Sequence, residues 1–227
     1  MLDLLDHIQC VIILGGKSSR FVDESSDPKP NYLIHGETWL TWQLDYVTQL
    51  GIRDVVLVLG YHFESLLDRH SFLELDQTVV FRDLKILSIL NDEPDRGPFS
   101  SLQLGLKSTI AKRVLYFPVD VPAPDLSTFK NLLSVKGEYD VVKCCYEDKG
   151  GHPLLIQGAF LQSLKSDNKE DQQLNQLIRN LSPHLVCRLQ TQNSDVLLNL
   201  NEPDDLERYV QNNPSRFLKL TKSFTQN

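Results

Sequence analysis

The sequence predicts an α/β fold in which a mainly parallel sheet is covered by helices on both faces, giving three layers. Short apolar runs such as Val11–Leu14 and Val55–Leu59 alternate with longer segments of helical periodicity. Both runs end on a glycine, at Gly15 and Gly60. Short continuous apolar runs closed by turn residues are typical of strands buried on both faces. Strands that alternate with helices favour a parallel sheet.

Length and composition favour one domain. The chain has 227 residues, of which 41% are hydrophobic and 23% are charged, as in ordinary globular proteins. No internal repeat, low-complexity tract or linker divides it. We expect one domain over residues 1–212 and a polar tail over residues 213–227, which shows no strong period.

Charge and cysteine usage exclude several classes of protein. The net charge of −7 argues against a nucleic-acid binder held by phosphate neutralisation. None of the four cysteines belongs to a C-x-x-C pair, so we expect reduced thiols rather than a zinc site or disulfides. Residues 1–9 lack the basic start of a secretory signal, and no apolar run approaches the roughly 20 residues of a membrane span. We therefore expect a cytoplasmic protein without a membrane partner.

The first half of the chain begins with a strand and continues through alternating elements. Apolar residues recur with helical spacing over Thr38–Leu50, and Gly51 supplies the stop signal. In order, the patterns predict a strand at 11–14, a helix at 38–50, strands at 55–59, 78–81 and 86–90, a helix at 99–110 and a strand at 114–119.

The second half repeats this alternation. Pro122 and Pro124 suit the turn and first-turn positions before a helix. The patterns predict a helix at 125–133, strands at 140–145 and 153–156, helices at 158–165 and 170–181, strands at 185–189 and 196–200, and a helix at 203–210.

A glycine-rich turn with basic residues follows the first predicted strand. It reads Gly15-Gly16-Lys17-Ser18-Ser19-Arg20, and Lys29 comes soon after. Open parallel sheets bind ligands at the carboxyl ends of their strands, and backbone amides in such a turn form an anion-binding nest. The run matches neither a Walker loop nor a G-x-G-x-x-G fingerprint. Its alternative interpretation is a glycine-rich connector with solvated charges.

Five segments, in order, carry a resemblance to a known family. They are Ile13–Phe21 with Lys29, then Gly97 with Ser100–Leu106, then Leu115–Pro122, then Gly151-His152-Pro153, and finally Asn199–Leu206. Together they resemble the MobA/MocA-like nucleotidyltransferases, which act in molybdenum-cofactor maturation. The chain departs from the family pattern at Val22, Asn201 and Glu202.

The resemblance implies a Rossmann-like fold of the nucleotide-diphospho-sugar transferase type, with a seven-stranded or similar sheet. It also implies Mg²⁺-dependent transfer of a nucleoside monophosphate from a nucleoside triphosphate, with GTP or CTP favoured, and release of pyrophosphate. The acceptor would be a small phosphorylated compound, first of all a molybdopterin-type cofactor. Two alternatives stay open: a sugar- or alditol-phosphate nucleotidyltransferase, and a catalytically weak nucleotide-binding or regulatory protein. Nothing in the sequence indicates a protein partner.

The same resemblance implies the site residues. Arg20, Lys29 and Asp120 would be catalytic, and Asp120 and Asn201 would bind the metal. The ligand-binding residues would be Leu14, Gly15, Gly16, Lys17, Ser18, Ser19, Gly97, Ser100, Ser101 and His152. Asp120 also follows a predicted buried strand, which brings a carboxylate to the ligand-binding edge. Asp120, Asn201 and the two serines have turn or helix-capping roles as alternatives, and His152 could be a structural turn residue.

Overall fold

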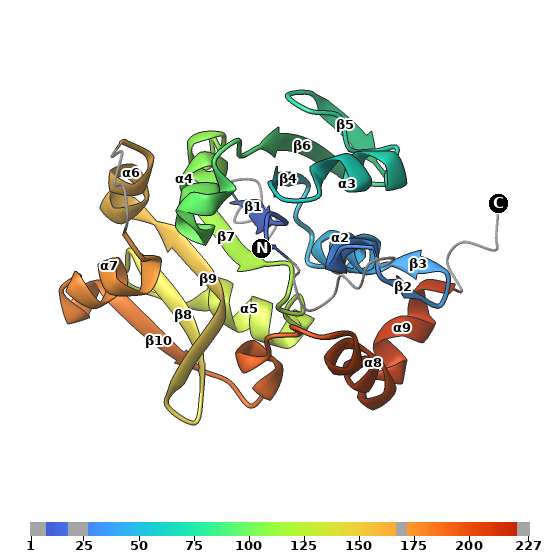
Figure 1. The fold of residues 1–227 in the computed structure, drawn as a ribbon. Helices are drawn as coiled ribbons and strands as arrows, with labels where there is room; N and C mark the ends of the chain where they lie inside the picture. The colour runs from blue at the N-terminus through green and yellow to red at the C-terminus, as the bar shows by residue number, and fades with distance from the viewer. Residues whose placement is uncertain (1–7, 18–26, 167–171, 222–227) are drawn as a thin grey trace.

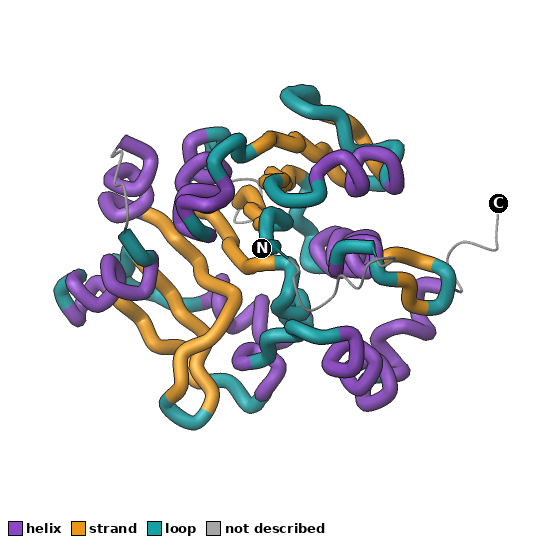
Figure 2. Tube along the Cα trace, viewed as in Figure 1, coloured by secondary structure: helices purple, strands orange, loops and turns teal. Residues whose placement is uncertain are grey.

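A single eight-stranded sheet forms the centre of the computed structural model, which describes residues 8–17, 27–166 and 172–221 (Figures 1 and 2). The strand order is β10-β8-β9-β7-β1-β4-β6-β5. The strands are β1 Ile8–Ile13, β4 Asp54–Leu59, β5 Thr78–Phe81, β6 Leu84–Leu90, β7 Arg113–Pro118, β8 Val141–Tyr146, β9 Lys149–Gln157 and β10 Val186–Gln190. The sheet thus has one strand more than the seven that the resemblance implied.

The sheet is mainly parallel, as predicted. β1 pairs in parallel with β4 and β7, β4 with β6, and β8 with β10. Only β5 and β9 run against their neighbours. The carboxyl ends of β1, β4 and β7 therefore meet at one edge, and the amino end of β9 reaches the same edge.

Helices cover both faces of the sheet and complete the three layers (Figure 1). They are α2 Trp39–Gln49, α3 Phe63–Arg69, α4 Pro98–Lys107, α5 Leu126–Ser134, α6 Gly158–Ser166, α7 Leu174–Asn180, α8 Pro203–Asn212 and α9 Pro214–Thr221. α4, α6 and α7 pack on one face, and the other five contribute to the core on the opposite face. Among the described helices, none has the length and apolarity that a membrane crossing requires.

Strand β1 shows why the apolar runs are continuous rather than alternating. Cys10 and Ile12 face one core, whereas Val11 and Ile13 face the other. A strand covered on both sides must be apolar at every position, because side chains point alternately to the two faces. The buried sheet fixes the strand ends, and these ends carry the site.

The strand predicted over Val196–Leu200 was wrong. A short 3-10 helix occupies Ser194–Leu197, and the Asn193 side chain accepts a hydrogen bond of 2.9 Å from the Asp195 amide. Val196, within this 3-10 helix, and Leu200, which follows it, are both buried. The apolar pattern thus reflects burial of an irregular segment, because a short apolar run by itself does not identify a strand.

Three elements were not predicted: α3, the β2–β3 hairpin (Leu33–Ile34 and Glu37–Thr38) and α9. α9 lies in the expected polar tail, where Phe217 is buried against Trp42 with ring centroids 5.0 Å apart. The helix predicted over 170–181 begins at Leu174 within the described part of the chain, and residues 170–171 lie outside it.

Candidate active site

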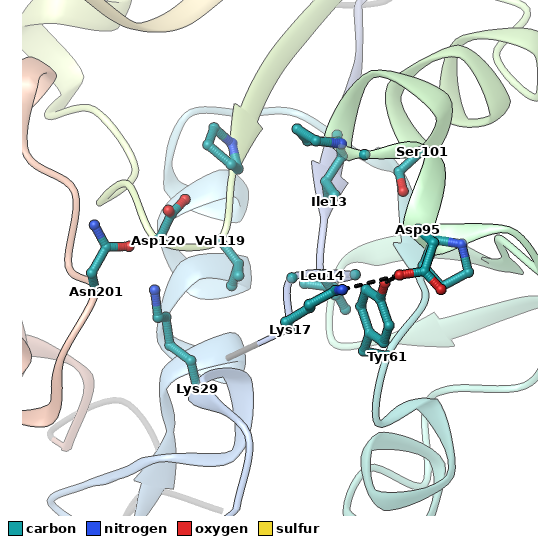
Figure 3. Close-up of a pocket in the computed structure, with 16 residues that line it drawn as sticks. Ile13, Leu14, Lys17, Lys29, Tyr61, Asp95, Ser101, Val119, Asp120 and Asn201 are labelled. Carbon is teal, nitrogen blue, oxygen red and sulfur yellow. Dashed lines mark hydrogen bonds and ion pairs between the residues drawn. The ribbon is translucent and has the colours of Figure 1, made fainter. Parts of the chain in front are cut away.

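A cavity of about 380 Å³ lies at the carboxyl ends of β1 and β7, and we call it the first cavity (Figure 3). It is lined by Ile13, Leu14, Gly15, Gly16, Lys17, Lys29, Tyr61, Pro94, Asp95, Gly97, Pro98, Ser101, Pro118, Val119, Asp120 and Asn201. Segments far apart in sequence converge here because the parallel strands end at one edge.

One wall of the first cavity carries Asp120, Asn201 and Lys29 (Figure 3). The Oδ1 atom of Asp120 is buried and has no hydrogen-bond partner. Burial raises the pKa of Asp120, and the positive charge of Lys29 lowers it again. The Leu200 amide donates a hydrogen bond of 2.8 Å to the Asp120 carbonyl. This bond ties the segment that carries Asn201 to the end of β7.

Lys29 belongs to a short 3-10 helix over Lys29–Asn31 and is only 7% exposed. The prolines on either side, Pro28 and Pro30, fix their own backbone φ angles and so restrict the segment. Burying the Lys29 ammonium removes water from a charged group, which costs free energy. Buried charged groups of this kind are common at functional sites.

The opposite wall carries an exposed cluster of Lys17, Tyr61 and Asp95 (Figure 3). The Lys17 ammonium lies 3.0 Å from a carboxylate oxygen of Asp95 and 5.2 Å from the centre of the Tyr61 ring. The Tyr61 hydroxyl donates a hydrogen bond to the same carboxylate. The hydrogen bonds from Tyr61 and Lys17 lower the pKa of Asp95. Lys17, the described basic residue of the glycine-rich turn, is therefore already paired with an acid.

The N-terminus of α4 lines the first cavity between the two walls. Gly97 has φ +87°, a conformation that favours glycine, and Pro98 follows at the first helical position. The Asn91 side chain donates hydrogen bonds of 2.9 Å to the hydroxyls of Ser100 and Ser101. Ser100 in turn donates 2.8 Å to the Gly97 carbonyl, whereas Ser101 lines the cavity.

A second cavity of about 430 Å³ adjoins the first, and the two share Gly97 and Pro98. Its lining is formed by Arg96, Gly97, Pro98, Phe99, Leu102, Tyr116, His152, Gln172, Gln173, Leu174 and Asn175. The rings of His152 and Tyr116 meet edge to face with centroids 5.4 Å apart. The Nδ1 atom of His152 is buried without a hydrogen-bond partner. Burial, together with the nearby charge of Lys143, lowers the pKa of His152 to about 4, so the imidazole is neutral at pH 7.

The donor set of the first cavity fits a hard divalent cation. Within the described ranges, no three His, Cys, Asp or Glu side chains group as a metal site. Asp120 and Asn201 together offer a carboxylate and an amide oxygen, and the unpartnered Oδ1 of Asp120 is a buried acceptor that a cation would satisfy. Mg²⁺ is held by oxygen ligands and keeps places for water and substrate phosphates, so two protein ligands are compatible with it.

The structure brings most of the predicted site residues together. Those lining the first cavity are Leu14, Gly15, Gly16, Lys17, Lys29, Gly97, Ser101, Asp120 and Asn201. His152 lies in the second cavity instead, and Ser100 lines neither cavity. Ser18, Ser19 and Arg20 lie outside the described residues.

Tyr61 and Asp95 are site residues that the sequence analysis did not identify. A signal for Tyr61 was present, because it follows Gly60 at the end of a predicted strand and so belongs at the same edge. Asp95 carries no comparable signal, since it follows the strand end by several residues within an irregular segment.

The model of one protein family matches this chain over residues 10–186, and its description is MobA-like NTP transferase domain. The chain belongs to this family. Its members transfer nucleotidyl groups, so the protein is a nucleotidyltransferase by family. The match spans the glycine-rich turn, the end of β7 and the lining of both cavities except Asn201. A comparison with curated protein sequences finds no match.

Solved structures of several proteins share the fold of this chain. The Rv0371c protein of Mycobacterium tuberculosis has 21% identity and a TM-score of 0.69, covering 90% of this chain and 97% of its own. It has also been solved with manganese. A nucleotidyl transferase from Methanothermobacter has 17% identity and a TM-score of 0.69, with coverage of 91% and 97%. The inositol-1-phosphate CTP transferase of T. maritima has 13% identity and a TM-score of 0.66, with coverage of 92% and 95%.

Proposed function

We propose that the protein moves a nucleoside monophosphate from a nucleoside triphosphate onto a small phosphorylated acceptor, with Mg²⁺ bound at Asp120 and Asn201. The observation that carries this proposal is the buried, unpartnered Oδ1 of Asp120 at the end of β7, on the cavity wall that also carries Lys29 and Asn201. A buried carboxylate oxygen without a hydrogen-bond partner is costly, and a bound cation would offset that cost. Family membership gives the reaction class that such a cation serves.

In the proposed reaction an oxygen of the acceptor phosphate attacks the α-phosphorus, and the bond to the leaving pyrophosphate breaks. The reaction consists mostly of positioning and charge neutralisation. Mg²⁺, when bound, supplies positive charge to the phosphate oxygens. Lys29 neutralises charge on the same wall, and the backbone of the glycine-rich turn, with Lys17, holds the phosphates. Ser101 and Gly97 line the side where the rest of the nucleotide lies.

The acceptor would occupy the second cavity, because it adjoins the first at Gly97 and Pro98. Its lining combines apolar side chains with the amides of Gln172, Gln173 and Asn175. Such a lining suits a small molecule with many hydrogen-bonding groups. A phosphorylated pterin of the molybdopterin type and a sugar or alditol phosphate both have this chemistry, and GTP and CTP are the favoured donors.

Pyrophosphate release tests the proposal. GTP, CTP, ATP and UTP are each incubated with Mg²⁺ and with extracted pterin cofactor, inositol 1-phosphate, glucose 1-phosphate or ribitol 5-phosphate. We expect release with one base and one acceptor, lost in Asp120→Ala and retained in Asp68→Asn, an exposed carboxylate on α3. Triphosphate binding without release from any pair would favour the nucleotide-binding alternative. Absence of triphosphate binding would exclude the first cavity as a nucleotide site.

A further inference from the structure

Polar side chains cross four strands on the sheet face covered by α4, α6 and α7. Arg188 on β10 lies directly opposite Lys143 on β8, and Lys143 lies opposite Leu154 on β9. Leu154 is in turn opposite Tyr116 on β7, whose ring contacts His152. Residues opposite one another on adjacent strands point to the same face. A row from Tyr116 through His152 and Lys143 to Arg188 therefore leads outward from the second cavity.

The Lys143 side chain lies over the β8–β9 hairpin, in space that a side chain at Gly150 would fill. A Cβ atom at Gly150 would lie 2.7 Å from the Lys143 ammonium, closer than real Cβ contacts come. The hairpin thus leaves space for the lysine, which is half-buried. Gly150 belongs to the amino end of β9, so the ammonium lies toward the sheet edge that carries both cavities.

Two arginines lie near Lys143. Burial lowers the pKa of Lys143; the Cys145 thiol opposes that change, and Arg188 and Arg179 of α7 lower the pKa further. Within the described part of the chain, no carboxylate forms an ion pair with the Lys143 ammonium. Arg188 donates a hydrogen bond to a backbone carbonyl, that of Asp148, rather than to a carboxylate. Like charges on adjacent strands are destabilising, so this arrangement lowers stability unless an anion occupies it.

His152 connects this cationic row to the second cavity. It is hydrogen-bonded to the Tyr116 main chain, which leaves the buried Nδ1 without a partner. In a neutral imidazole whose other nitrogen donates, Nδ1 accepts a hydrogen bond. A ligand that lies between Gly97 and Lys143 and carries a hydroxyl or N–H group would donate this hydrogen bond to Nδ1.

We propose that the acceptor carries two anionic groups: the phosphate that attacks, placed in the second cavity toward Gly97, and a carboxylate or second phosphate that extends beyond the cavity lining and is held by Lys143 and Arg188. This inference rests on the proposed function, since it assigns the acceptor to the second cavity. Between its two anionic groups the acceptor carries a hydrogen-bond donor, which His152 accepts.

Calorimetric binding of matched probes tests this inference without any need for turnover. Sorbitol 6-phosphate and 6-phosphogluconate share a six-carbon hydroxylated chain and a phosphate, and differ at the far end, where only the second carries a carboxylate. Hexitol 1,6-bisphosphate places a phosphate there instead. We expect the carboxylate or the bisphosphate probe to bind at least about tenfold more tightly than sorbitol 6-phosphate, as charge-assisted contacts imply.

Variants then locate the preference. Lys143→Gln and Arg188→Gln should each remove most of it while leaving the affinity for sorbitol 6-phosphate unchanged, and Lys130→Gln, an exposed lysine on α5, should retain it. Arg188 is exposed, so its variant tests the inference even if Lys143→Gln unfolds. Equal binding of the three probes, no binding of any of them, or a preference that survives both variants would overturn the inference. None of these results depends on pyrophosphate release, so they are distinct from a failure of the proposed reaction.

Discussion

The first and second cavities share Gly97 and Pro98, yet their charged groups are balanced differently. In the first cavity the basic residues already have acidic neighbours, with Lys17 paired to Asp95 and Lys29 beside Asp120. In the second, the lining cation Arg96 is paired with Glu93, whereas His152 Nδ1 lacks a partner, and Lys143, which lies near His152 but outside the lining, has no ion pair among the described residues. Phosphates that bind at Lys17 in the first cavity must therefore exchange an existing contact, whereas a ligand that reaches His152 and Lys143 completes missing ones.

The two cavities illustrate two kinds of anion-binding site, one with cations already paired to acids and one with groups that lack a partner. The Lys17–Asp95 pair balances charge in the empty first cavity, but Asp95 competes with the incoming phosphates. The unpartnered Nδ1 of His152 and the unpaired Lys143 lower the stability of the empty protein, and no described carboxylate competes for them. Functional sites commonly reduce stability in this way.

The largest effect should come from Asp120→Asn, which tests whether the first cavity depends on its buried carboxylate. We expect turnover to fall by about 10³-fold, as for loss of a group that stabilises transition-state charge. The folded pKa of Asp120 lies above the unfolded value of 3.8, so its ionised form destabilises the metal-free protein as pH rises above that value. The variant should therefore melt at a higher temperature than the parent at pH 7 without metal. Unchanged turnover, or a lower melting temperature, would contradict the assignment.

Lys29→Met comes next and tests the second charge on the same wall. Removing the ammonium beside the phosphates should lower kcat by about 10²-fold. Steady-state kinetics with saturating triphosphate measure this, and Lys130→Met provides the exposed control. A change in KM alone would show that Lys29 serves binding rather than the transition state.

Two buried histidines, one at the second cavity and one outside both cavities, can be compared through the pH dependence of stability. The pKa of His152 and that of His70 are both lowered to about 4, chiefly by burial, but His70 donates a hydrogen bond of 2.9 Å to Asn31. Since both folded pKa values lie below the unfolded value of 6.5, each histidine's contribution is present above pH 6.5 and is lost as pH falls toward 4. The loss is on the order of 3 kcal/mol for each group.

Urea unfolding between pH 4 and 8 tests the two side chains separately. His152→Gln and His70→Gln should each flatten the loss of stability below pH 6.5. Each variant also removes a formed hydrogen bond, that of His70 to Asn31 or that of His152 to the Tyr116 main chain, so both should lower stability at pH 7.5. A variant whose stability falls below pH 6.5 as steeply as that of the parent would show that its histidine is not the group that titrates.

The smallest effect should come from Asp95→Asn, which removes the competing acid of the first cavity. Lys17 would then meet the triphosphate without first leaving a carboxylate, so KM for the triphosphate should fall by about threefold, in keeping with the modest strength of exposed ion pairs. Added salt should reduce the difference between variant and parent. A raised KM would indicate that Asp95 contacts the nucleotide directly.

The position of Asp120 could be predicted because it depends only on the end of one buried strand. His152 was named from the family resemblance alone, because the strand pattern assumed a mainly parallel sheet and β9 runs antiparallel. An antiparallel strand brings its beginning, rather than its end, to the ligand edge. The pairing of Lys143 with Arg188 depends on sheet register between strands far apart in sequence, which periodicity does not contain.

The predicted helices and strands were confirmed where an apolar period reflects burial of a regular element, as in β4 and α2. The same reasoning failed at Val196, where a buried irregular segment mimics a strand. It also failed for α9, whose described apolar anchor is the single residue Phe217. Contacts between residues far apart in sequence determine the structure of such segments, and a local sequence pattern contains no information about those contacts.

The attachment of α9 has a consequence for how the protein is made. Phe217 packs on Trp42, and the Tyr46 hydroxyl donates a hydrogen bond of 2.6 Å to the Arg216 carbonyl across 170 residues of sequence. During synthesis α2 emerges long before these partners, so its apolar surface stays exposed on the ribosome while the rest of the sheet is translated. At translation speeds of about 5–20 residues per second this lasts roughly 10–30 seconds, an interval in which a chaperone has time to bind the nascent chain.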